Sequence, residues 1–410
     1  MNRELAQTVV ASFRTRSAQV VERQLAPFSE TDWMRTRSWL HTSGLALYLV
    51  DRVTALGIPS VIPQELFRGL SVNLKENRVR TADLFDEFVK INTAFQRAEI
   101  LYANVKGFTL APSACSDPAL RYQHDLDFLV ARHDAERCRQ VLSQWGYIQT
   151  LVSGDSWEFH AGPAAVCSMR DLYRVRAQRS VELHLVPEAE EECANNRLSR
   201  LQLQVWSRFE FPALSSGDRL LLQATHLFHH FLSEWTRTAW LLEYAAAIRA
   251  QRADGNIWRQ VEAILHATPE IRTGVGMASL IASRTFAVKL PPELARVVDA
   301  LPPRVRLWID RYEQSLVFTE HPGSKLYLLL KDVLFEGSPD WPRQKRKKLV
   351  PWRLPQKIVV AKSGSMQMSL RVNMAQIRFV LQRLRFHIVT GLRYRLEAAR
   401  WRRILAGSQW

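Results

Sequence analysis

The chain has 410 residues and a formal charge of +16, and 47% of its residues are apolar while 23% are charged. This composition supports about two to three folded domains and excludes a disordered or low-complexity protein. Uncharged stretches such as 40–50 and 273–283 have about half of the ~20 residues that a membrane-spanning helix needs, and none reaches that length. We therefore expect no segment to cross a bilayer, and the charged residues within 1–5 predict no secretory signal.

The cysteine spacing predicts the redox environment. The four cysteines are more than twenty residues apart in the sequence: Cys115, Cys138, Cys167 and Cys193. This spacing fits neither a zinc-binding pattern nor the disulfide framework of a small secreted protein. We therefore expect a reducing, cytoplasmic location.

The excess positive charge lies at one end of the chain. Residues 341–410 contain 17 Lys and Arg and a single acid, Glu397, which leaves 39 basic and 39 acidic residues in 1–340. The first part is thus a neutral body and the second a basic extension. A basic extension predicts an anionic partner, such as a nucleotide, a nucleic acid or the lipid headgroups at the inner face of a membrane.

The predicted elements begin with helices and continue with strands. Residues 1–99 are expected to be helical, with a turn at 57–63 and an apolar stripe over 84–95. A helix is also predicted between Asp134, as its cap, and Gly146, as its stop. Short apolar runs typical of strands lie on both sides of this helix, at 100–105, 126–130, 147–152, 157–160, 167–175 and 181–186.

Strands that bracket a helix indicate a small mixed sheet. The helical period returns at 216 and continues to about residue 320. The predicted fold class is α+β, a small mixed β-sheet core flanked by N-terminal and C-terminal helical regions. The predicted divisions are a helical region at 1–99, an α/β core at 100–215, a helical domain at 216–340 and a basic amphipathic tail at 341–410.

Three acids in the predicted sheet form a candidate metal site. Asp125 and Asp127 are two apart in a strand, so both carboxylates leave the sheet on one face. Glu182 shares a face with His184 in another alternating strand. If the two strands are neighbours, the three carboxylates converge as in two-metal phosphoryl transfer, and oxygen ligands of this kind suit Mg²⁺. The alternative is a chance pair of solvated aspartates.

Lys106, Gly107 and Arg121, which precede the two aspartates in the sequence, are candidate phosphate ligands. Lys106 and Gly107 form a turn after a strand, where backbone N–H groups and an ammonium can meet a phosphate, or where a turn simply forms. Arg121 is interpreted either as an ion-pair partner of the aspartates or as a phosphate clamp.

A basic stripe is predicted on the helix after the sheet. At 100° per residue, Arg219, His226, His230 and Arg237 fall within about 40° beside a buried face, whereas His229 points outward. We expect this stripe to border the cleft above the aspartates and to contact phosphates. The alternative is that His226 and His230 are structural. A zinc site at these two histidines is disfavoured because no third ligand has a suitable spacing.

The pattern of residues in the tail, 341–410, predicts a basic amphipathic helix. Five cations occupy six positions at 343–348, between Trp341 and Trp352. Apolar residues then repeat at spacings of four and three, with arginines between them: Leu370, Met374, Ile377, Leu381, Leu384, Ile388 and Leu392. This helix is expected to pack on the N-terminal helices, to lie on an anionic membrane, to bind RNA or a partner protein, or to close over the sheet.

The order of these motifs resembles a known family. Val-Lys-Gly at 105–107, Arg121, Asp-x-Asp at 125–127, a helix that ends in Gly-Tyr at 146–147, and Glu-x-His at 182–184 are similar to the uncharacterised bacterial nucleotidyltransferases of the polymerase-beta-type superfamily. Two histidines four apart and a following acid, here His226, His230 and Glu243, extend the resemblance over roughly 35–250.

The resemblance implies roles for these residues. Asp125 and Asp127 would hold Mg²⁺ or Mn²⁺, and Glu182 would be a ligand or a general base. Lys106 and Gly107 would form the phosphate-binding turn, although the superfamily usually has Gly-Ser or Gly-Gly there and this chain has Gly107-Phe108.

The leading hypothesis is therefore a metal-dependent nucleotidyltransferase that moves a nucleoside monophosphate from an NTP such as ATP to an unidentified acceptor. One alternative is a catalytically silent scaffold of the same fold that binds a membrane or a biosynthetic partner through its tail. Another is an RNA-binding protein that acts on RNA ends, which the neutral body disfavours.

Overall fold

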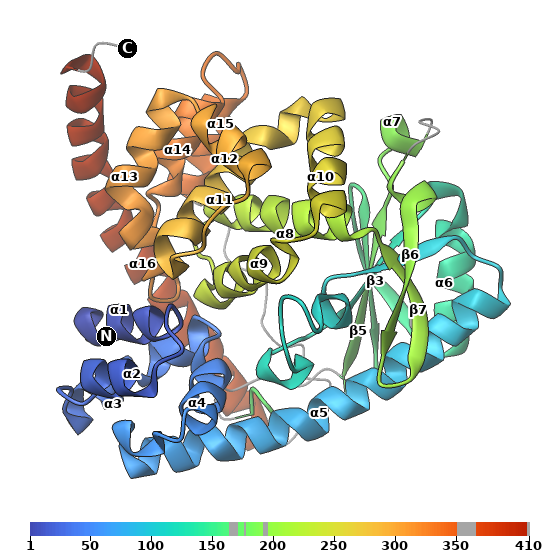
Figure 1. Ribbon diagram of the computed structural model, residues 1–410, viewed down its shortest axis with the longest axis horizontal. Coiled ribbons are helices and arrows are strands. Elements are labelled where there is room, and N and C mark those ends of the chain that lie inside the picture. The colour runs from blue at the N-terminus through green and yellow to red at the C-terminus, as the bar shows by residue number, and fades with distance from the viewer. Residues whose placement is uncertain (164–170, 176–177, 192–195, 351–365, 408–410) are drawn as a thin grey trace.

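A computed structural model describes residues 1–163, 171–175, 178–191, 196–350 and 366–407. The molecule has a sheet at one end and a helical assembly at the other, and one long helix runs between them (Figure 1). The expected α+β class and mixed sheet are confirmed. Among the described residues, none of the helices is both long and apolar enough to pass through a bilayer.

Five helices precede the sheet: α1 (Arg3–Ser12), α2 (Ala18–Leu25), α3 (Glu30–Thr42), α4 (Ala46–Ala55) and α5 (Gln64–Arg97). Polar caps start three of them, because the side chains of Asn2, Ser17 and Ser29 accept hydrogen bonds from free backbone N–H groups of the first turn. Helix α5 has 34 residues, which at 1.5 Å per residue is about 50 Å. It therefore reaches from the helical assembly to the sheet.

The sheet has seven strands in the order β3-β4-β5-β2-β1-β7-β6. Two neighbouring pairs are parallel, β2 with β5 and β1 with β7, and the others are antiparallel. The bounds are β1 (Tyr102–Val105), β2 (Leu126–Val130), β3 (Ile148–Ser153), β4 (Ser156–Ala161), β5 (Arg179–Leu185), β6 (Leu201–Trp206) and β7 (Phe209–Leu214).

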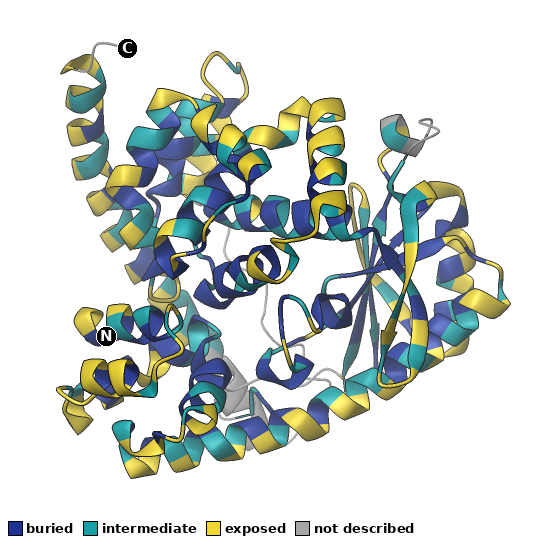
Figure 2. Ribbon diagram, in the orientation of Figure 1, coloured by how far each residue is buried: buried dark blue, intermediate teal, exposed yellow. Residues whose placement is uncertain are grey.

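Helices α5 and α6 (Ala135–Gln144) cover one face of the sheet with an apolar layer. Figure 2 shows the central strands as buried, whereas α5 alternates between buried and exposed residues along its length. Phe88 of α5 lies among aromatic rings, with centroids 5.0 Å from Phe108 and 4.9 Å from Phe211. These contacts fix the segment that follows β1, which contains residues of the candidate site.

The opposite face carries a smaller apolar cluster that includes Val105, Leu129 and Val186, and Leu222 of α8 packs against it. Helix α8 (Ser216–Phe231) thus lies over this face. The remaining helices are α7 (Glu188–Glu191), α9 (Thr238–Gln251), α10 (Gly255–Ala267), α11 (Arg272–Phe286), α12 (Pro292–Asp299), α13 (Pro303–Val317), α14 (Tyr327–Leu334), α15 (Trp341–Leu349) and α16 (Met366–Gly407).

The helices before and after the sheet share one core. Leu5 and Trp33 from the N-terminal helices belong to the same buried cluster as Ile281, Trp308 and Leu329 from the later ones. The four-part division of the chain stays a prediction, but α1–α4 pack with α8–α14 rather than alone.

Several local expectations were wrong or fall outside the described residues. Residues 171–175 form turns and bends rather than a strand, and 164–170 are not described. The hairpin of β6 and β7 was not anticipated. Asp134 precedes α6 but its side chain does not cap it, because it accepts from the Leu101 backbone N–H at 3.2 Å and pairs with Arg137 at 2.7 Å.

The expected tail helix is present as α16, but its predicted apolar stripe is not the face that it buries. Trp352, Leu370 and their neighbours lie outside the residues whose side chains are described. The side chains of α16 contact α13, α14 and α15 through Tyr312, Asp332 and Lys345.

Replacing Phe88 by Ala should destabilise the fold by about 3–5 kcal/mol, because it opens a cavity in the aromatic layer between α5 and the sheet. Urea unfolding followed by tryptophan fluorescence measures the loss. Val79, on the same helix but 60% exposed, is the control, and Val79→Ala should change stability by less than about 0.5 kcal/mol. Equal effects of the two substitutions would contradict this packing.

Candidate active site

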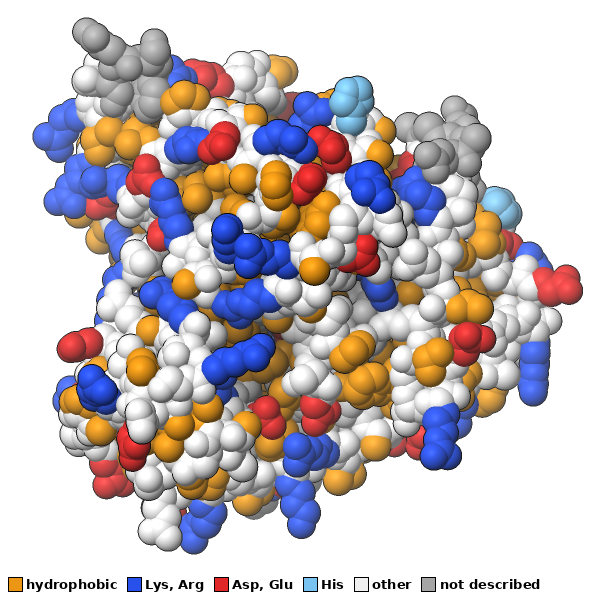
Figure 3. Space-filling view, viewed as in Figure 1, with side chains coloured by type: hydrophobic (Ala, Val, Ile, Leu, Met, Phe, Trp, Pro, Cys, Tyr) orange, Lys and Arg blue, Asp and Glu red, His pale blue; other side chains and the backbone are white. Residues whose placement is uncertain are grey.

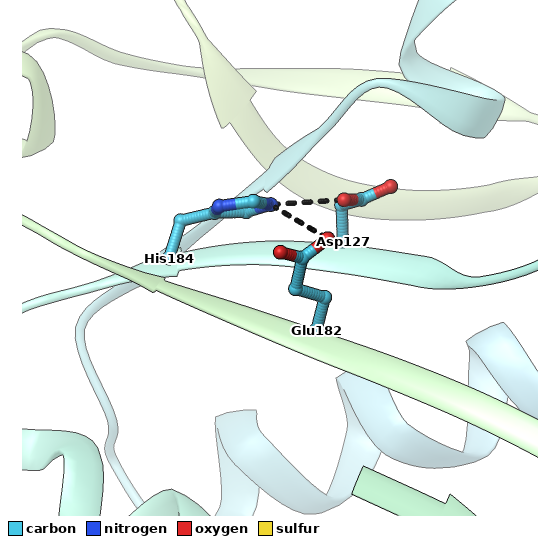
Figure 4. Close-up of side chains that lie close together, drawn as sticks. All are labelled: Asp127, Glu182 and His184. Carbon is cyan, nitrogen blue, oxygen red and sulfur yellow. Dashed lines mark hydrogen bonds and ion pairs between the residues drawn. The ribbon is translucent and has the colours of Figure 1, made fainter. Parts of the chain in front are cut away.

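Asp127, Glu182 and His184 converge on the face of the sheet that α8 covers. Asp127 and Glu182 are direct neighbours in the parallel register of β2 and β5. His184 follows two residues later in β5, so it leaves the sheet on the same face as Glu182. His184 Nε2 lies 2.9 Å from Asp127 Oδ1 and 3.6 Å from Glu182 Oε2 (Figure 4). One ligand atom from each residue lies within 4.8 Å of the others.

Lys106 supplies the positive charge in this cluster. Its Nζ lies 2.6 Å from Asp127 Oδ1, 3.2 Å from His184 Nε2 and 3.9 Å from Glu182 Oε2. Val105, the last residue of β1, pairs with Asp127, and Lys106 follows with a φ of 57°. The end of β1 therefore places the ammonium among the three ligand atoms.

The electrostatics of the cluster follow from burial and from this ammonium. Burial alone would lower the pKa of Lys106, but the carboxylates of Asp127 and Glu182 outweigh it and raise that pKa. Burial opposes ionisation of Asp127, yet Lys106 and His184 hold the pKa of Asp127 well below its usual range. Asp127 is thus a buried carboxylate that stays ionised because a cation is beside it.

Asp125 lies just before β2 rather than within it. Burial first, and then the neighbouring Asp127 carboxylate, raise the pKa of Asp125 to about 7. Among the described residues, the group that could hold a metal ion consists of Asp127, Glu182 and His184. The structure thus brings Asp127 and Glu182 together but does not place Asp125 in this group.

The backbone of Gly107 packs closely against the side chain of Gln123. Its φ is +47°, and a Cβ there would lie 2.4 Å from Gln123 Nε2, so Gln123 fills the space above the turn. Gln123 in turn donates to the backbone oxygen of Asp125 at 3.0 Å. The helix that follows is a single 3₁₀ turn, Gly107–Leu110. The lack of a side chain at Gly107 thus serves packing against the segment before β2.

Arg121 pairs with Glu243 of α9 rather than with the aspartates. Its Nε lies 2.8 Å from Glu243 Oε1, which also accepts from the Tyr48 hydroxyl at 2.8 Å. The group is buried, and Glu243 outweighs the effect of burial and raises the pKa of Arg121. This network joins α4, α9 and the loop between β1 and β2.

A pocket opens beside the cluster, between the loop after β1 and helices α8 and α9. Its lining brings cationic, amide, aromatic and acidic side chains together with Lys106: Arg121, Arg219, Gln223, His226, Trp240 and Glu243. The Oε1 atom of Gln223 is buried and has no hydrogen-bond partner among the described residues. As expected, part of the basic stripe therefore borders the space next to the acidic cluster.

His226, His230 and Trp240 form a cluster of rings that meet edge-on or at a tilt. The ring centroids of His226 and His230 lie 4.6 Å apart, and they lie 5.0 Å and 4.2 Å from that of Trp240. Burial, and then the charges of neighbours such as Lys106, lower the pKa of His226 to about 2. Burial also lowers the pKa of His230 to about 4. Both rings are therefore neutral at pH 7.

The stripe does not continue along α8 as expected. Helix α8 ends at Phe231, and Arg237 is the N-terminal cap residue of α9. Its guanidinium lies over the rings of Tyr122 and Trp240, each 5.5 Å from the centroid. His229 is exposed, as expected.

His184 is a member of the cluster that was not predicted. Its shared strand face with Glu182 was expected, but no role was assigned to it. The alternating pattern at 181–185, with a histidine two residues after an acid, is the signal that identifies it.

Residues 29–287 match a family model described as uncharacterised nucleotidyltransferase. This segment spans more than half of the chain and includes the whole sheet, the acidic cluster, His226 and His230. It contains the range of 35–250 over which the resemblance was expected. No curated protein matches the chain.

Replacing His226 and His230 by Gln should flatten the pH dependence of stability below pH 6.5. In the unfolded chain these histidines bind protons near pH 6.5, whereas in the folded protein His230 stays neutral to about pH 4 and His226 to about pH 2. Unfolding therefore takes up protons, and stability is lost as the pH falls from 6.5 towards 4.

Melting temperatures at stepped pH measure this effect, with nucleotide affinity measured in parallel. The exposed His229 gives the control His229→Gln, which should keep the wild-type slope. If stability depended on pH as steeply in the double variant as in the wild type, the neutral state of His226 and His230 would be contradicted. Lower affinity at unchanged stability would instead favour a ligand-binding role.

Proposed function

The chain belongs to an uncharacterised nucleotidyltransferase family, and from this premise we propose that it uses a divalent cation to transfer a nucleoside monophosphate from an NTP to an acceptor. The observation that carries the proposal is the convergence of Asp127, Glu182 and His184 around one ammonium group. An oxygen of the acceptor forms a bond to the α-phosphorus, the bond to the α–β bridging oxygen breaks, and pyrophosphate leaves with that electron pair.

The donor set fits a divalent cation. Two carboxylates suit Mg²⁺ and Mn²⁺, and the imidazole nitrogen of His184 favours the transition metal. Glu182 Oε1 accepts from the Ser156 hydroxyl, which orients this carboxylate and leaves Oε2 facing the cluster. A bound cation would neutralise charge on the phosphates and orient the reacting oxygens. We therefore propose Mg²⁺ or Mn²⁺, with Mn²⁺ bound more tightly.

Asp125 would join the ligands once a cation is bound. Its raised pKa comes from burial and from the Asp127 carboxylate, and a second positive charge beside Asp127 acts in the opposite direction. Cation binding should thus release a proton from Asp125. A carboxylate of this group, for which we propose Glu182, takes the proton from the acceptor hydroxyl as the new bond forms.

Lys106 would exchange its carboxylate partners for substrate phosphates. A divalent cation and the Lys106 ammonium cannot both lie between Asp127, Glu182 and His184, because like charges a few ångströms apart repel strongly in a buried site. Lys106 also lines the adjacent pocket with Arg121, Arg219 and His226. An ammonium displaced from Asp127 would face this pocket, where it and Arg219 would bind the triphosphate.

Asp127→Asn and Glu182→Gln should each weaken Mn²⁺ binding by at least about tenfold, or about 1.4 kcal/mol, because each removes a charged ligand. Thermal shift with Mn²⁺ or Mg²⁺ and each of the four NTPs, together with titration calorimetry, measures the loss.

The matched control is Glu210→Gln, which removes an exposed carboxylate from β7 and should leave metal binding unchanged. Metal-dependent shifts of equal size in all four proteins would refute the proposed site and leave the silent scaffold.

Lys106→Met should change metal and nucleotide binding in opposite directions. Without the competing ammonium, Mn²⁺ affinity should rise by about tenfold, whereas affinity for the NTP should fall by a similar factor, about 1.4 kcal/mol each way. Calorimetry with Mn²⁺ alone, and then with NTP at saturating Mn²⁺, separates the two effects. Lys75→Met, at an exposed position on α5, is the control. Weaker Mn²⁺ binding in Lys106→Met would show that Lys106 organises the ligands and does not compete with the metal.

A further inference from the structure

The described side chains of helix α16 that are buried against the rest of the chain lie on one side of the helix. Phe386, Tyr394 and Trp401 are the buried residues of this side, with 6%, 5% and 2% exposure. The Lys345 ammonium lies over the Tyr394 ring, 5.5 Å from its centroid, in a cation–π contact. The ring centroids of Trp401 and Tyr312 are 5.9 Å apart. These contacts hold the helix against α13 and α15.

The opposite side of α16 carries an apolar stripe that nothing in the described part of the chain covers. Its eight residues are between 53% and 67% exposed: Met374, Ile377, Leu381, Leu384, Ile388, Val389, Leu392 and Leu396. At 100° per residue they fall within an arc of about 140°, centred roughly opposite Tyr394 and Trp401. The stripe is about 33 Å long at 1.5 Å per residue. A helix that docks one face normally presents a polar face to water.

Arginines run through and beside this stripe. The exposed ones are Arg378, Arg385, Arg393, Arg395, Arg400, Arg402 and Arg403. The only acid in the helix, Glu397, lies toward the body and pairs with Arg311 at 3.3 Å and Arg400 at 2.7 Å. Figure 3 shows basic side chains with apolar ones between them along the edge of the molecule that α16 occupies in Figure 1. The outer face of α16 is thus both apolar and cationic.

An apolar and cationic face favours one kind of partner over the others. A second copy of the helix would bring arginines against arginines, which opposes pairing. A nucleic acid would neutralise the arginines but would leave eight apolar side chains in water. An anionic bilayer satisfies both, because acyl chains accept the apolar stripe while headgroup phosphates accept the flanking guanidinium groups.

We propose that the outer face of α16 is a docking surface for an anionic phospholipid bilayer, on which the helix lies flat. The helix does not enter further, because seven exposed arginines are distributed along it and keep it at the level of the headgroups. This surface is independent of the proposed catalytic chemistry.

Flotation of the full chain with phospholipid vesicles tests the proposal. The wild type should float with vesicles of phosphatidylcholine mixed with phosphatidylglycerol, at least about tenfold more than with phosphatidylcholine alone, and binding should weaken as salt rises. Leu381→Glu/Ile388→Glu, which places charge in the stripe, should reduce binding by at least about tenfold.

Val72→Glu/Val79→Glu is the matched control, because these valines are 50% and 60% exposed on α5. It adds the same charge away from α16 and should float like the wild type. Unchanged melting temperatures and an unchanged Mn²⁺ shift show that each variant is folded.

Three results would overturn the proposal. The first is wild-type protein that stays with neither vesicle, or with both equally. The second is a control that loses binding as much as the α16 variant. The third is a wild-type dimer in light scattering that Leu381→Glu/Ile388→Glu converts to a monomer without a change in flotation, which would assign the face to a second copy.

Discussion

The buried charge on Asp127 is the constraint on which the site depends. Its carboxylate lies in the middle of a seven-stranded sheet, between an apolar layer under α8 and the side chains of Glu182 and His184. An ionised group at such a position is strongly unfavourable unless an opposite charge lies beside it. Lys106 meets this need at 2.6 Å, so the fold itself supplies a cation at the centre of the cluster of Asp127, Glu182 and His184.

The arrangement around this pair is built from strand ends. Lys106 directly follows β1, Asp127 lies in the first half of β2, and Glu182 is its partner in β5. The aromatic layer behind the sheet, with Phe88 against Phe108, fixes the segment after Lys106. The Arg121–Glu243 pair fixes the loop before β2 against α9. Packing on one side and a buried ion pair on the other therefore hold the two ends of the same loop.

The sequence predicted the parts of the site that depend on local pattern. Alternation at 126–130 and 181–185 predicts which side chains share a face, and Asp127 and Glu182 do share one. Whether two strands are neighbours is a non-local property, and the convergence of the acids was therefore conditional on it. The family resemblance, which rests on several weak motifs in a fixed order, led to the family that the matched segment shows.

What the sequence did not predict depends on contacts between distant residues. Arg121 and Glu243 are 122 positions apart, and no spacing rule connects them. Helix α8 was extended too far because Trp235 continues its apolar period, although the chain turns after Phe231. The hairpin β6–β7 was missed although Leu201, Leu203 and Val205 alternate with glutamines in β6. The apolar side of this edge strand is not the buried one, because Leu203 is 67% and Val205 59% exposed, so the pairing of β6 with β7 depends on the sheet and not on a buried apolar face.

The two cationic regions of the chain differ in a way that separates their roles. Lys106 and Arg121 are paired with carboxylates and largely shielded from water, so dissolved salt screens them little. The arginines on the outer face of α16 are exposed, and their attraction for anions is screened within about 8–10 Å at physiological ionic strength. Charge at the Asp127 cluster is thus balanced within the fold, whereas the surplus of +16 comes from residues beyond the matched family segment. Charges in the neutral body are thus paired and little affected by salt, whereas those of the basic extension are exposed and screened by it. A partner that binds the extension need not affect the charge balance at Asp127.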